Sequence, residues 1–240
     1  MYKQISMKIL LCSTPVEAPG DTLLRARSEG PIPIMPKTAI VSLIYWMRKN
    51  GYPDCDFYDI DMLYPTTEEV ENAIREYKPD IVGLSAVVST QYAQVKHLSK
   101  LIKKINPNTV VVCGGYLTAA ANVILRKTEV DICVNGNGEI VWVDILNHIK
   151  KFKKINIKEL SNIQGVMFID DNDKLVSNGK GETIPQEQMP YPDYDLLKTG
   201  LRDKPELIEN YFRDAKYANL FHMDERFYDG SRGKMLATLL

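Results

Sequence analysis

Two glycine-bearing segments in the middle of the chain are the clearest indication of a ligand site. Residues 110–113 are an apolar run that ends in Gly114-Gly115-Tyr116, and residues 130–134 are a second run that ends in Asn135-Gly136-Asn137-Gly138-Glu139. A glycine after a strand lets the backbone approach a bulky group closely, and a helix that starts there offers free N–H donors. This pattern favours binding of a large ligand over acid–base catalysis.

Hydroxyl side chains follow two further apolar runs and add hydrogen-bonding groups to the same set. The candidate binding residues are Ser13, Ser85, Ser89, Thr90, Gly114, Gly115, Tyr116, Gly136, Gly138 and Glu139. Each also has a purely structural interpretation. The glycines suit tight turns, the serines suit local caps, and Glu139 suits the positive end of a helix dipole. The functional hypothesis depends on whether the fold brings them to one edge.

The alternation of apolar runs and amphipathic segments predicts which elements position these residues. Predicted strands cover residues 7–12, 55–59, 80–85, 110–113 and 131–134, and predicted helices cover 38–50, 67–77, 91–105, 118–126 and 139–150. Five strands alternating with helices predict an α/β fold with a five-stranded parallel sheet covered on both faces. In a doubly wound, Rossmann-like sheet of flavodoxin-type order 2-1-3-4-5, the carboxyl ends of the strands meet at one edge, where ligands bind.

The pattern changes after residue 154. Residues 163–169 and 174–177 predict a β-hairpin, a proline-bearing connector follows, residues 204–217 suit a helix, and residues 234–240 form a strand-like apolar run with no evident partner. We therefore expect a Rossmann-like domain over 1–155, a hairpin and connector over 156–200, and a partly irregular linker over 201–240 that ends in the first strand of a missing domain.

Bulk properties exclude several classes of protein. The chain has 240 residues, a formal net charge of −1, 45% hydrophobic and 25% charged residues, which suits a soluble globular protein and favours neither nucleic acid nor an anionic membrane as partner. No apolar run approaches the ~20 residues of a membrane span, and no signal peptide is evident, so a cytoplasmic location is expected. The four cysteines lack C-x-x-C spacing and are predicted to be buried thiols.

Other candidate chemistry is sparse. His97 and His148 lie among lysines and are predicted to face solvent. His222, with Asp224 and Glu225, has ligand types for a metal site, but the spacing is not diagnostic. No G-x-G-x-x-G follows the first strand and no P-loop is present, which disfavours dinucleotide and nucleoside triphosphate sites.

Several of these segments together resemble the amino-terminal cobalamin-binding domain of the B12-dependent radical SAM enzymes. The resemblance covers about residues 7–200 and depends on the order and spacing of its parts, which are residues 79–85, residues 112–116 with Ala119-Ala120, residues 130–139, the hairpin from Ile163, and the connector 189–197. It implies a corrin ring over the carboxyl edge of the sheet. The nucleotide tail would then lie near Ser85, Ser89, Gly114, Gly115 and Gly136.

Three departures from the family pattern qualify this resemblance. The loop over residues 13–36 contains no histidine, so the Asp-x-His-x-x-Gly motif is absent and the cobalt is expected to be base-off without a protein imidazole. The chain has Gly136-Asn137-Gly138-Glu139 where the family often has Gly-Glu-Gly-Glu. It also has no Cys-x-x-x-Cys-x-x-Cys, so a [4Fe–4S] cluster and S-adenosylmethionine would belong to a missing radical SAM domain.

The resemblance therefore implies the cobalamin-binding module of a B12-dependent radical SAM protein, most simply a methyltransferase, whose partners are a corrinoid and a separate radical SAM domain. A cofactor-free flavodoxin-like or receiver-like interaction module is the alternative. A receiver needs clustered acids after the first strand and a lysine after the fifth, whereas this chain has Cys12-Ser13-Thr14 and Asn135-Gly136 there. A metal site around His222 is a third hypothesis.

Overall fold

A single mixed sheet forms the centre of the molecule. The computed structural model describes residues 7–15, 36–189 and 193–212. Within them, seven strands pair in the order β2-β1-β3-β4-β5-β6-β7. They are β1 (Ile9–Ser13), β2 (Cys55–Tyr58), β3 (Ile81–Ser85), β4 (Val110–Gly114), β5 (Ile132–Val134), β6 (Val166–Ile169) and β7 (Leu175–Ser177). The first five are parallel in the order 2-1-3-4-5, which confirms the predicted doubly wound arrangement.

The predicted strand count was wrong, because the hairpin belongs to the same sheet. Strand β6 pairs antiparallel with β5, with Val134 opposite Val166, and β7 pairs with β6. Docking there covers the outer edge of β5, and the buried side chains of Val166 and Phe168 continue the core. The sequence predicts a hairpin from local turn residues, but the strand that the hairpin pairs with is a long-range contact.

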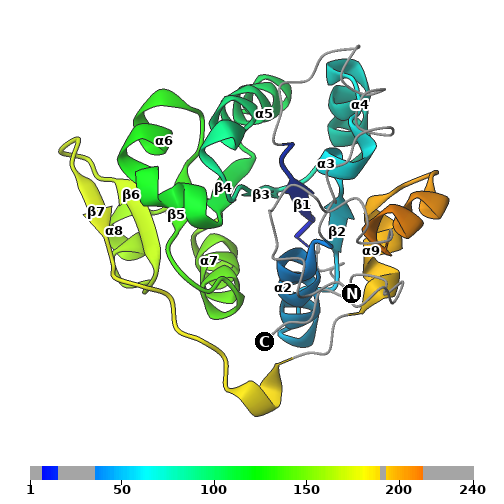
Figure 1. Ribbon diagram of the computed structural model, residues 1–240. Coiled ribbons are helices and arrows are strands. Elements are labelled where there is room, and N and C mark those ends of the chain that lie inside the picture. Colours follow the sequence, from blue (N-terminus) through cyan, green and yellow to red (C-terminus); the bar gives the residue numbers. More distant parts are fainter. Residues whose placement is uncertain (1–6, 16–35, 190–192, 213–240) are drawn as a thin grey trace, which may run out of the picture.

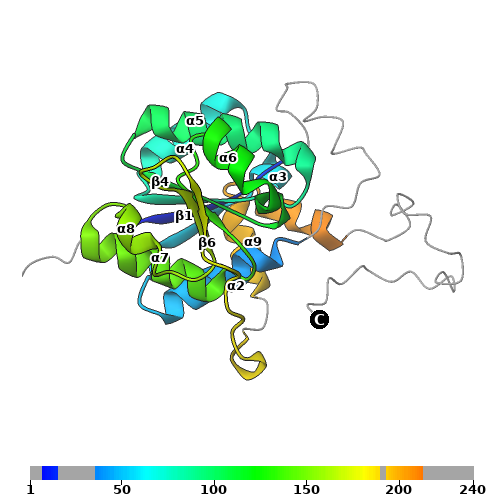
Figure 2. The same ribbon diagram turned by 90° about the vertical axis from the view of Figure 1, so that its left-hand side faces the viewer.

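Helices cover both faces of the sheet (Figure 1). The α-helices are α2 (Thr38–Lys49), α3 (Ile60–Leu63), α4 (Thr67–Tyr77), α5 (Tyr92–Ile105), α6 (Ala121–Lys127), α7 (Glu139–Phe152), α8 (Ile157–Leu160) and α9 (Tyr194–Gly200), and the 3₁₀ segments are η1 (Ser89–Gln91), η2 (Tyr116–Ala120), η3 (Gln186–Gln188) and η4 (Pro205–Phe212). Helices α2 and α7 lie on one side, and α4, α5 and α6 on the other, which Figure 2 shows edge-on.

Local sequence explains the long helices well. Helix α4 begins with a capping box: the Thr66 hydroxyl accepts from the Glu69 N–H, and the Glu69 carboxylate accepts from the Thr66 N–H at 2.7 Å. This satisfies donors that the first turn leaves free. Val70 and Ile74, four residues apart, are buried against the sheet. The helix ends at Tyr77, just before the predicted stop at Pro79.

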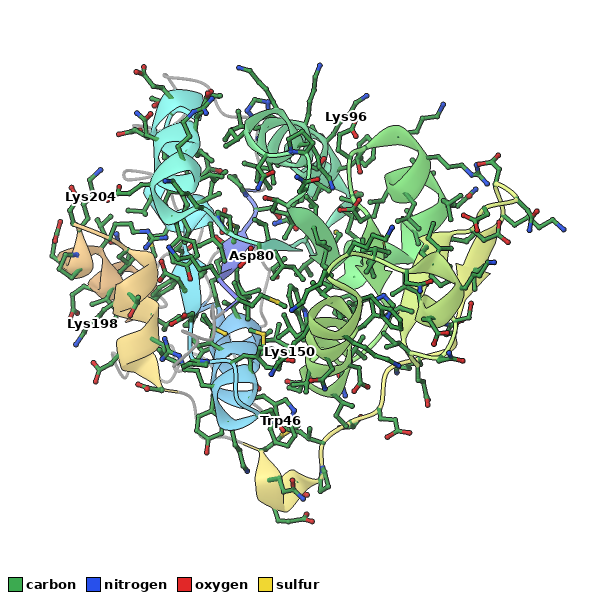
Figure 3. All side chains as sticks on the ribbon, turned by 180° about the vertical axis from the view of Figure 1, so that it is seen from behind. Trp46, Asp80, Lys96, Lys150, Lys198 and Lys204 are labelled. Carbon is green, nitrogen blue, oxygen red and sulfur yellow. The ribbon has the colours of Figure 1, made fainter. Side chains whose placement is uncertain are left out.

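Alternate residues of the strands enter two separate cores. Ile9 and Leu11 face α2 and α7, whereas Leu10 and Cys12 belong to the core beneath α4, α5 and α6. In Figure 3, Trp46 of α2 and Lys150 of α7 lie on one side of the sheet and Lys96 of α5 lies on the other. Both faces are buried, which explains the nearly continuous apolar runs of the sequence.

The segment after the hairpin returns to the opposite end of the sheet. Residues 178–189 run past α7 toward α2 (Figure 1). Helix α9 then packs on β2, with Leu197 and Leu201 buried, and Gly200 is so close to Phe57 that an added Cβ would lie 2.3 Å from the ring. The helix predicted over 204–217 is seen as η4 as far as Phe212; the rest of it and the predicted strand 234–240 lie outside the described residues.

The cysteines agree with prediction and one histidine does not. All four cysteines are buried free thiols, and burial raises the pKa of Cys12 and of Cys55 to about 12. His148, predicted to face solvent, is buried, and its Nε2 accepts from the Asn156 N–H at 2.9 Å. The chain turns back at Lys153 in a left-handed conformation, so α8 covers this histidine. His97 is partly exposed, 3.2 Å from the Thr67 hydroxyl.

Candidate functional site

The sheet register brings three of the predicted site residues into one row at the carboxyl edge. Ser13 of β1 is opposite Ser85 of β3, which is opposite Gly114 of β4. Because side chains alternate along a strand, this row lies on the same face as Leu11, the face covered by α2 and α7. Three small residues in neighbouring strands leave little side-chain volume at this end of the sheet.

Gly114 and Gly115 have different structural roles. Among the residues that the structure describes, none has an atom within 4 Å of a Cβ added at Gly114. Gly115 has φ +93° and ψ 177°, a region essentially restricted to glycine, and a Cβ there would lie 2.2 Å from the Ala86 carbonyl oxygen. The fold therefore requires Gly115 to be glycine, whereas at Gly114 it leaves space open.

Backbone and hydroxyl hydrogen bonds join the turns after β3, β4 and β5. The Ala86 N–H donates to the Gly114 carbonyl at 2.9 Å, and the Leu117 N–H donates to the Ala86 carbonyl at 3.1 Å. The buried Thr118 hydroxyl lies 2.8 Å from the Gly115 carbonyl and 3.0 Å from the Val134 carbonyl. Together with the residues that end β1 and begin α7, these turns make up the carboxyl edge of the sheet, which we call the rim, comprising residues 13–14, 85–91, 114–118 and 135–139.

The rim exposes apolar side chains beside its polar groups. Val87 is 51% exposed, Val88 43% and Tyr116 84%. Ser89 and Thr90 are exposed next to the two valines. The rim therefore combines exposed apolar surface with hydroxyl groups, two features that a ligand with both apolar and polar parts requires.

Ser13 belongs to a buried network that the sequence analysis missed. Its hydroxyl donates to the Asp59 carboxylate at 2.6 Å and accepts from the Asp61 N–H at 3.0 Å. Asp59 also caps α3 and accepts from the Tyr211 hydroxyl. The Ser13 hydroxyl is thus bonded within the protein, and its predicted contact with a cofactor would have to be made by its backbone.

Asp59 is fully buried, and burial raises the pKa of its carboxyl from 3.8 to about 6, although the Lys37 charge and the Ser13 hydroxyl act to lower that pKa. Lys37 itself forms an ion pair of 2.6 Å with Asp61. The network joins β1, the turn after β2, the start of α2 and η4. Its sequence signal is that Asp59 is the last residue of a predicted strand and Asp61 lies two residues beyond it, so both belong at the same edge.

The segment around Gly136 packs against the irregular segment that follows the hairpin, with an isolated β-bridge between Gly136 and Gly181. A Cβ at Gly136 would lie 2.6 Å from the Lys180 side chain, and the Gly181 N–H donates to the Asn135 carbonyl at 2.7 Å. The Asn137 amide donates to the Thr183 hydroxyl at 2.6 Å. Chain packing alone therefore accounts for glycine at 136, and its predicted contact with a cofactor stays a prediction.

The start of α7 is joined to α2. The Ser42 hydroxyl donates to the Glu139 carboxylate at 2.9 Å, and a Cβ at Gly138 would lie 3.0 Å from the Leu43 side chain. These contacts bring the two helices together beside the row of Ser13, Ser85 and Gly114. Glu139 thus has a protein partner in addition to its place at a helix N-terminus.

The described part of the chain offers neither a metal site nor a membrane-spanning helix. Within it, no group of three or more His, Cys, Asp or Glu side chains is placed to hold a metal ion, and the hypothetical site at His222, Asp224 and Glu225 lies outside it. Of the helices that the structure describes, none is long and apolar enough to cross a bilayer.

A family comparison identifies the domain. Residues 33–146 match the family model described as the B12 binding domain. The chain contains a B12-binding domain. The resemblance to the B12-binding domain of B12-dependent radical SAM enzymes that the sequence predicts is confirmed.

Curated relatives are considerably longer than this chain. The chain is 29% identical over 154 residues to the anaerobic magnesium-protoporphyrin IX monomethyl ester cyclase of Cereibacter sphaeroides, covering 63% of this chain and 24% of that protein. It is 30% identical over 135 residues to the uncharacterized methyltransferase PH0819 of Pyrococcus horikoshii, covering 55% of this chain and 28% of that protein. The chain thus spans about a quarter of the length of these relatives.

Solved structures share the fold of the B12-binding domain. The cobalamin-dependent S-adenosylmethionine radical enzyme OxsB with aqua-cobalamin bound superposes with a TM-score of 0.65 at 18% identity, over 86% of this chain and 26% of that one. The radical S-adenosylmethionine methyltransferase TsrM from Kitasatospora setae superposes with a TM-score of 0.57 at 15% identity, over 72% and 30%. At these identities the likeness is one of fold.

Proposed function

We propose that this chain holds cobalamin at the rim and serves as the cofactor-binding module of a B12-dependent radical SAM protein of methyltransferase type. The observation that carries the proposal is the open space at Gly114, in a row of small residues on the α2–α7 face, within a B12-binding domain. The proposed cofactor contacts are the backbone at Gly114 and Gly115, the hydroxyls of Ser85, Ser89 and Thr90, and the side chain of Tyr116.

The chemical character of the rim fits a corrinoid. A corrin has a broad apolar ring edged with amides and a nucleotide tail that carries a phosphate. Val87, Val88 and Tyr116 offer apolar surface to such a ring, and the adjacent hydroxyls and amide groups offer hydrogen bonds to its edge. Small residues at Ser85 and Gly114 leave depth for the tail.

The described rim has no histidine, since His97 lies beside α4 and His148 lies under α8. Residues 13–36 also contain none. These observations support cobalamin held base-off without a protein imidazole. When bound, the cofactor supplies cobalt chemistry, and the residues of this chain bind and orient it. A [4Fe–4S] cluster and S-adenosylmethionine would belong to a separate radical SAM domain.

Replacement of Gly114 tests the proposal. Gly114→Phe places a ring in the space proposed for the cofactor, so we expect at least about a tenfold loss of hydroxocobalamin affinity. Because a Cβ at this position meets no atom of the described residues, the backbone itself accepts a side chain here, and the stability of the variant shows whether the larger ring is tolerated as well. Absorbance titration with gel filtration measures retention of the corrinoid, and thermal unfolding measures stability.

The matched control is Lys96→Phe, which adds the same ring on the exposed outer side of α5 (Figure 3) and should leave affinity unchanged. Gly114→Val is a smaller replacement in case the phenylalanine impairs folding. Wild-type protein that retains no corrinoid at high micromolar concentration would refute the proposal and favour the cofactor-free interaction module.

A further inference from the structure

A buried glutamine organises the turn that presents the two exposed valines. The Gln91 side-chain oxygen accepts from the backbone N–H groups of Val87 and Val88, at 2.5 and 2.9 Å. Its amide nitrogen donates to the carbonyl of Thr14, at the end of β1. Gln91 is buried, so these bonds are shielded from water.

These contacts close a ring of bonds between the turns after β1 and β3. The Thr14 N–H and hydroxyl both donate to the Ser85 carbonyl, at 3.2 and 2.6 Å, so Thr14 is tied to β3 directly and also through Gln91. The N–H groups of Val87 and Val88 are used by Gln91 and are not free to bind a ligand. What the turn offers at the rim is therefore the apolar side chains of Val87 and Val88.

The geometry points to Gln91 as a positioning residue of the cofactor site, one that holds the Val87-Val88 turn against β1 so that both valines face the corrin ring. This inference builds on the proposed cobalamin site. A charged side chain cannot replace Gln91, because the role requires one side chain to accept from two N–H groups and to donate to a carbonyl. A carboxylate can only accept, and an ammonium or guanidinium group can only donate. Of the neutral side chains, only an amide or a protonated carboxyl meets that requirement at this length.

Gln91→Glu separates the acceptor function of Gln91 from its donor function. A carboxylate still accepts from Val87 and Val88, but it repels the Thr14 carbonyl, and we expect about a tenfold loss of hydroxocobalamin affinity at about pH 7.5. At about pH 5 the buried carboxyl is partly protonated and regains a donor, so affinity should recover toward that of wild type measured at the same pH. Gln91→Leu, which lacks all these groups, should lose affinity at both pH values.

The control is Asn50→Asp at the far end of α2. The Asn50 amide donates to the Trp46 carbonyl at 2.8 Å, so this variant undergoes the same amide-to-carboxylate change away from the rim. Its hydroxocobalamin affinity should neither fall at about pH 7.5 nor rise at about pH 5. If Gln91 merely stabilised the fold, Gln91→Glu would lower the unfolding temperature at about pH 7.5 while the folded protein kept wild-type affinity, so both quantities are measured. Wild-type affinity for Gln91→Glu at about pH 7.5, or a loss without recovery at about pH 5, would overturn the role of Gln91. Failure of wild type to bind would instead refute the cobalamin site.

Discussion

Gly115→Ala is expected to lower the free energy of unfolding by about 3 kcal/mol and to reduce hydroxocobalamin retention. The backbone at Gly115 has φ +93° and ψ 177°, and the new methyl carbon would lie 2.2 Å from the Ala86 carbonyl oxygen. Both obstacles are backbone geometry, so no side-chain rotation can relieve them. Relief requires the β3 and β4 turns to separate, which breaks the Leu117 to Ala86 hydrogen bond. Urea unfolding and absorbance titration measure the two effects.

Gly114→Ala is the matched control for this prediction. It adds the same methyl group one residue earlier, where no atom of the described part of the chain lies within 4 Å, and should change stability by less than about 1 kcal/mol. Equal stabilities for Gly115→Ala and Gly114→Ala would mean that the β4 turn does not have the conformation described. A Gly115→Ala variant that is stable and binds hydroxocobalamin normally would show that binding does not depend on the conformation of the β4 turn.

As pH rises from about 4 to 7, the wild-type protein is expected to lose stability through Asp59. Asp59→Asn is expected not to show this loss. Burial raises the pKa of Asp59 from 3.8 to about 6, so the folded state holds this proton more tightly than the unfolded state. The stabilisation is therefore complete below about pH 4 and is lost as pH rises through 6, by on the order of 3 kcal/mol. An asparagine can accept from Ser13 and donate to the Tyr211 oxygen without carrying a charge. Urea unfolding at several pH values measures the difference between the two proteins.

Ser13→Ala is the control, because it removes a hydrogen bond to Asp59 but keeps the carboxyl, so the pH dependence should persist. His148 contributes with the opposite sign, since burial lowers its pKa and protonation at low pH destabilises the fold. The comparison of Asp59→Asn with wild type cancels that contribution. Parallel pH profiles for the two proteins would show that Asp59 is not the buried group responsible.

The Asp59 network also bears on how the chain continues after this domain. Tyr211 bonds to Asp59, Arg202 pairs with Asp56 at 2.7 Å, and the Gly200 carbonyl accepts from the Asp59 N–H at 2.9 Å. Residues 193–212 are thereby attached to the end of β2, next to the rim. The domain boundaries expected at 155 and 200 remain predictions. A protein that ends at either boundary would lose the contacts that Arg202 and Tyr211 make at the end of β2.

Much of the fold follows from local patterns in the sequence. Apolar runs, the spacing of Val70 and Ile74, and stops such as Pro79 predict the five parallel strands and the long helices, because strand and helix periodicity and turn chemistry act within a few residues. Parallel strands align their carboxyl ends, so the gathering of Ser13, Ser85 and Gly114 at one edge was also predictable, as was the family from the order of its segments.

Other features depend on contacts between residues far apart in the chain. The edge on which the hairpin docks, the burial of His148, and the bonds of Asp59 to Tyr211 and of Gln91 to Thr14 have no local signature, since the packing of distant segments decides them. The two glycines after β4 illustrate the difference. Their sequence marks a turn at a ligand site, whereas the position of the Ala86 carbonyl makes Gly115 a requirement of the fold and leaves Gly114 open toward the proposed cofactor.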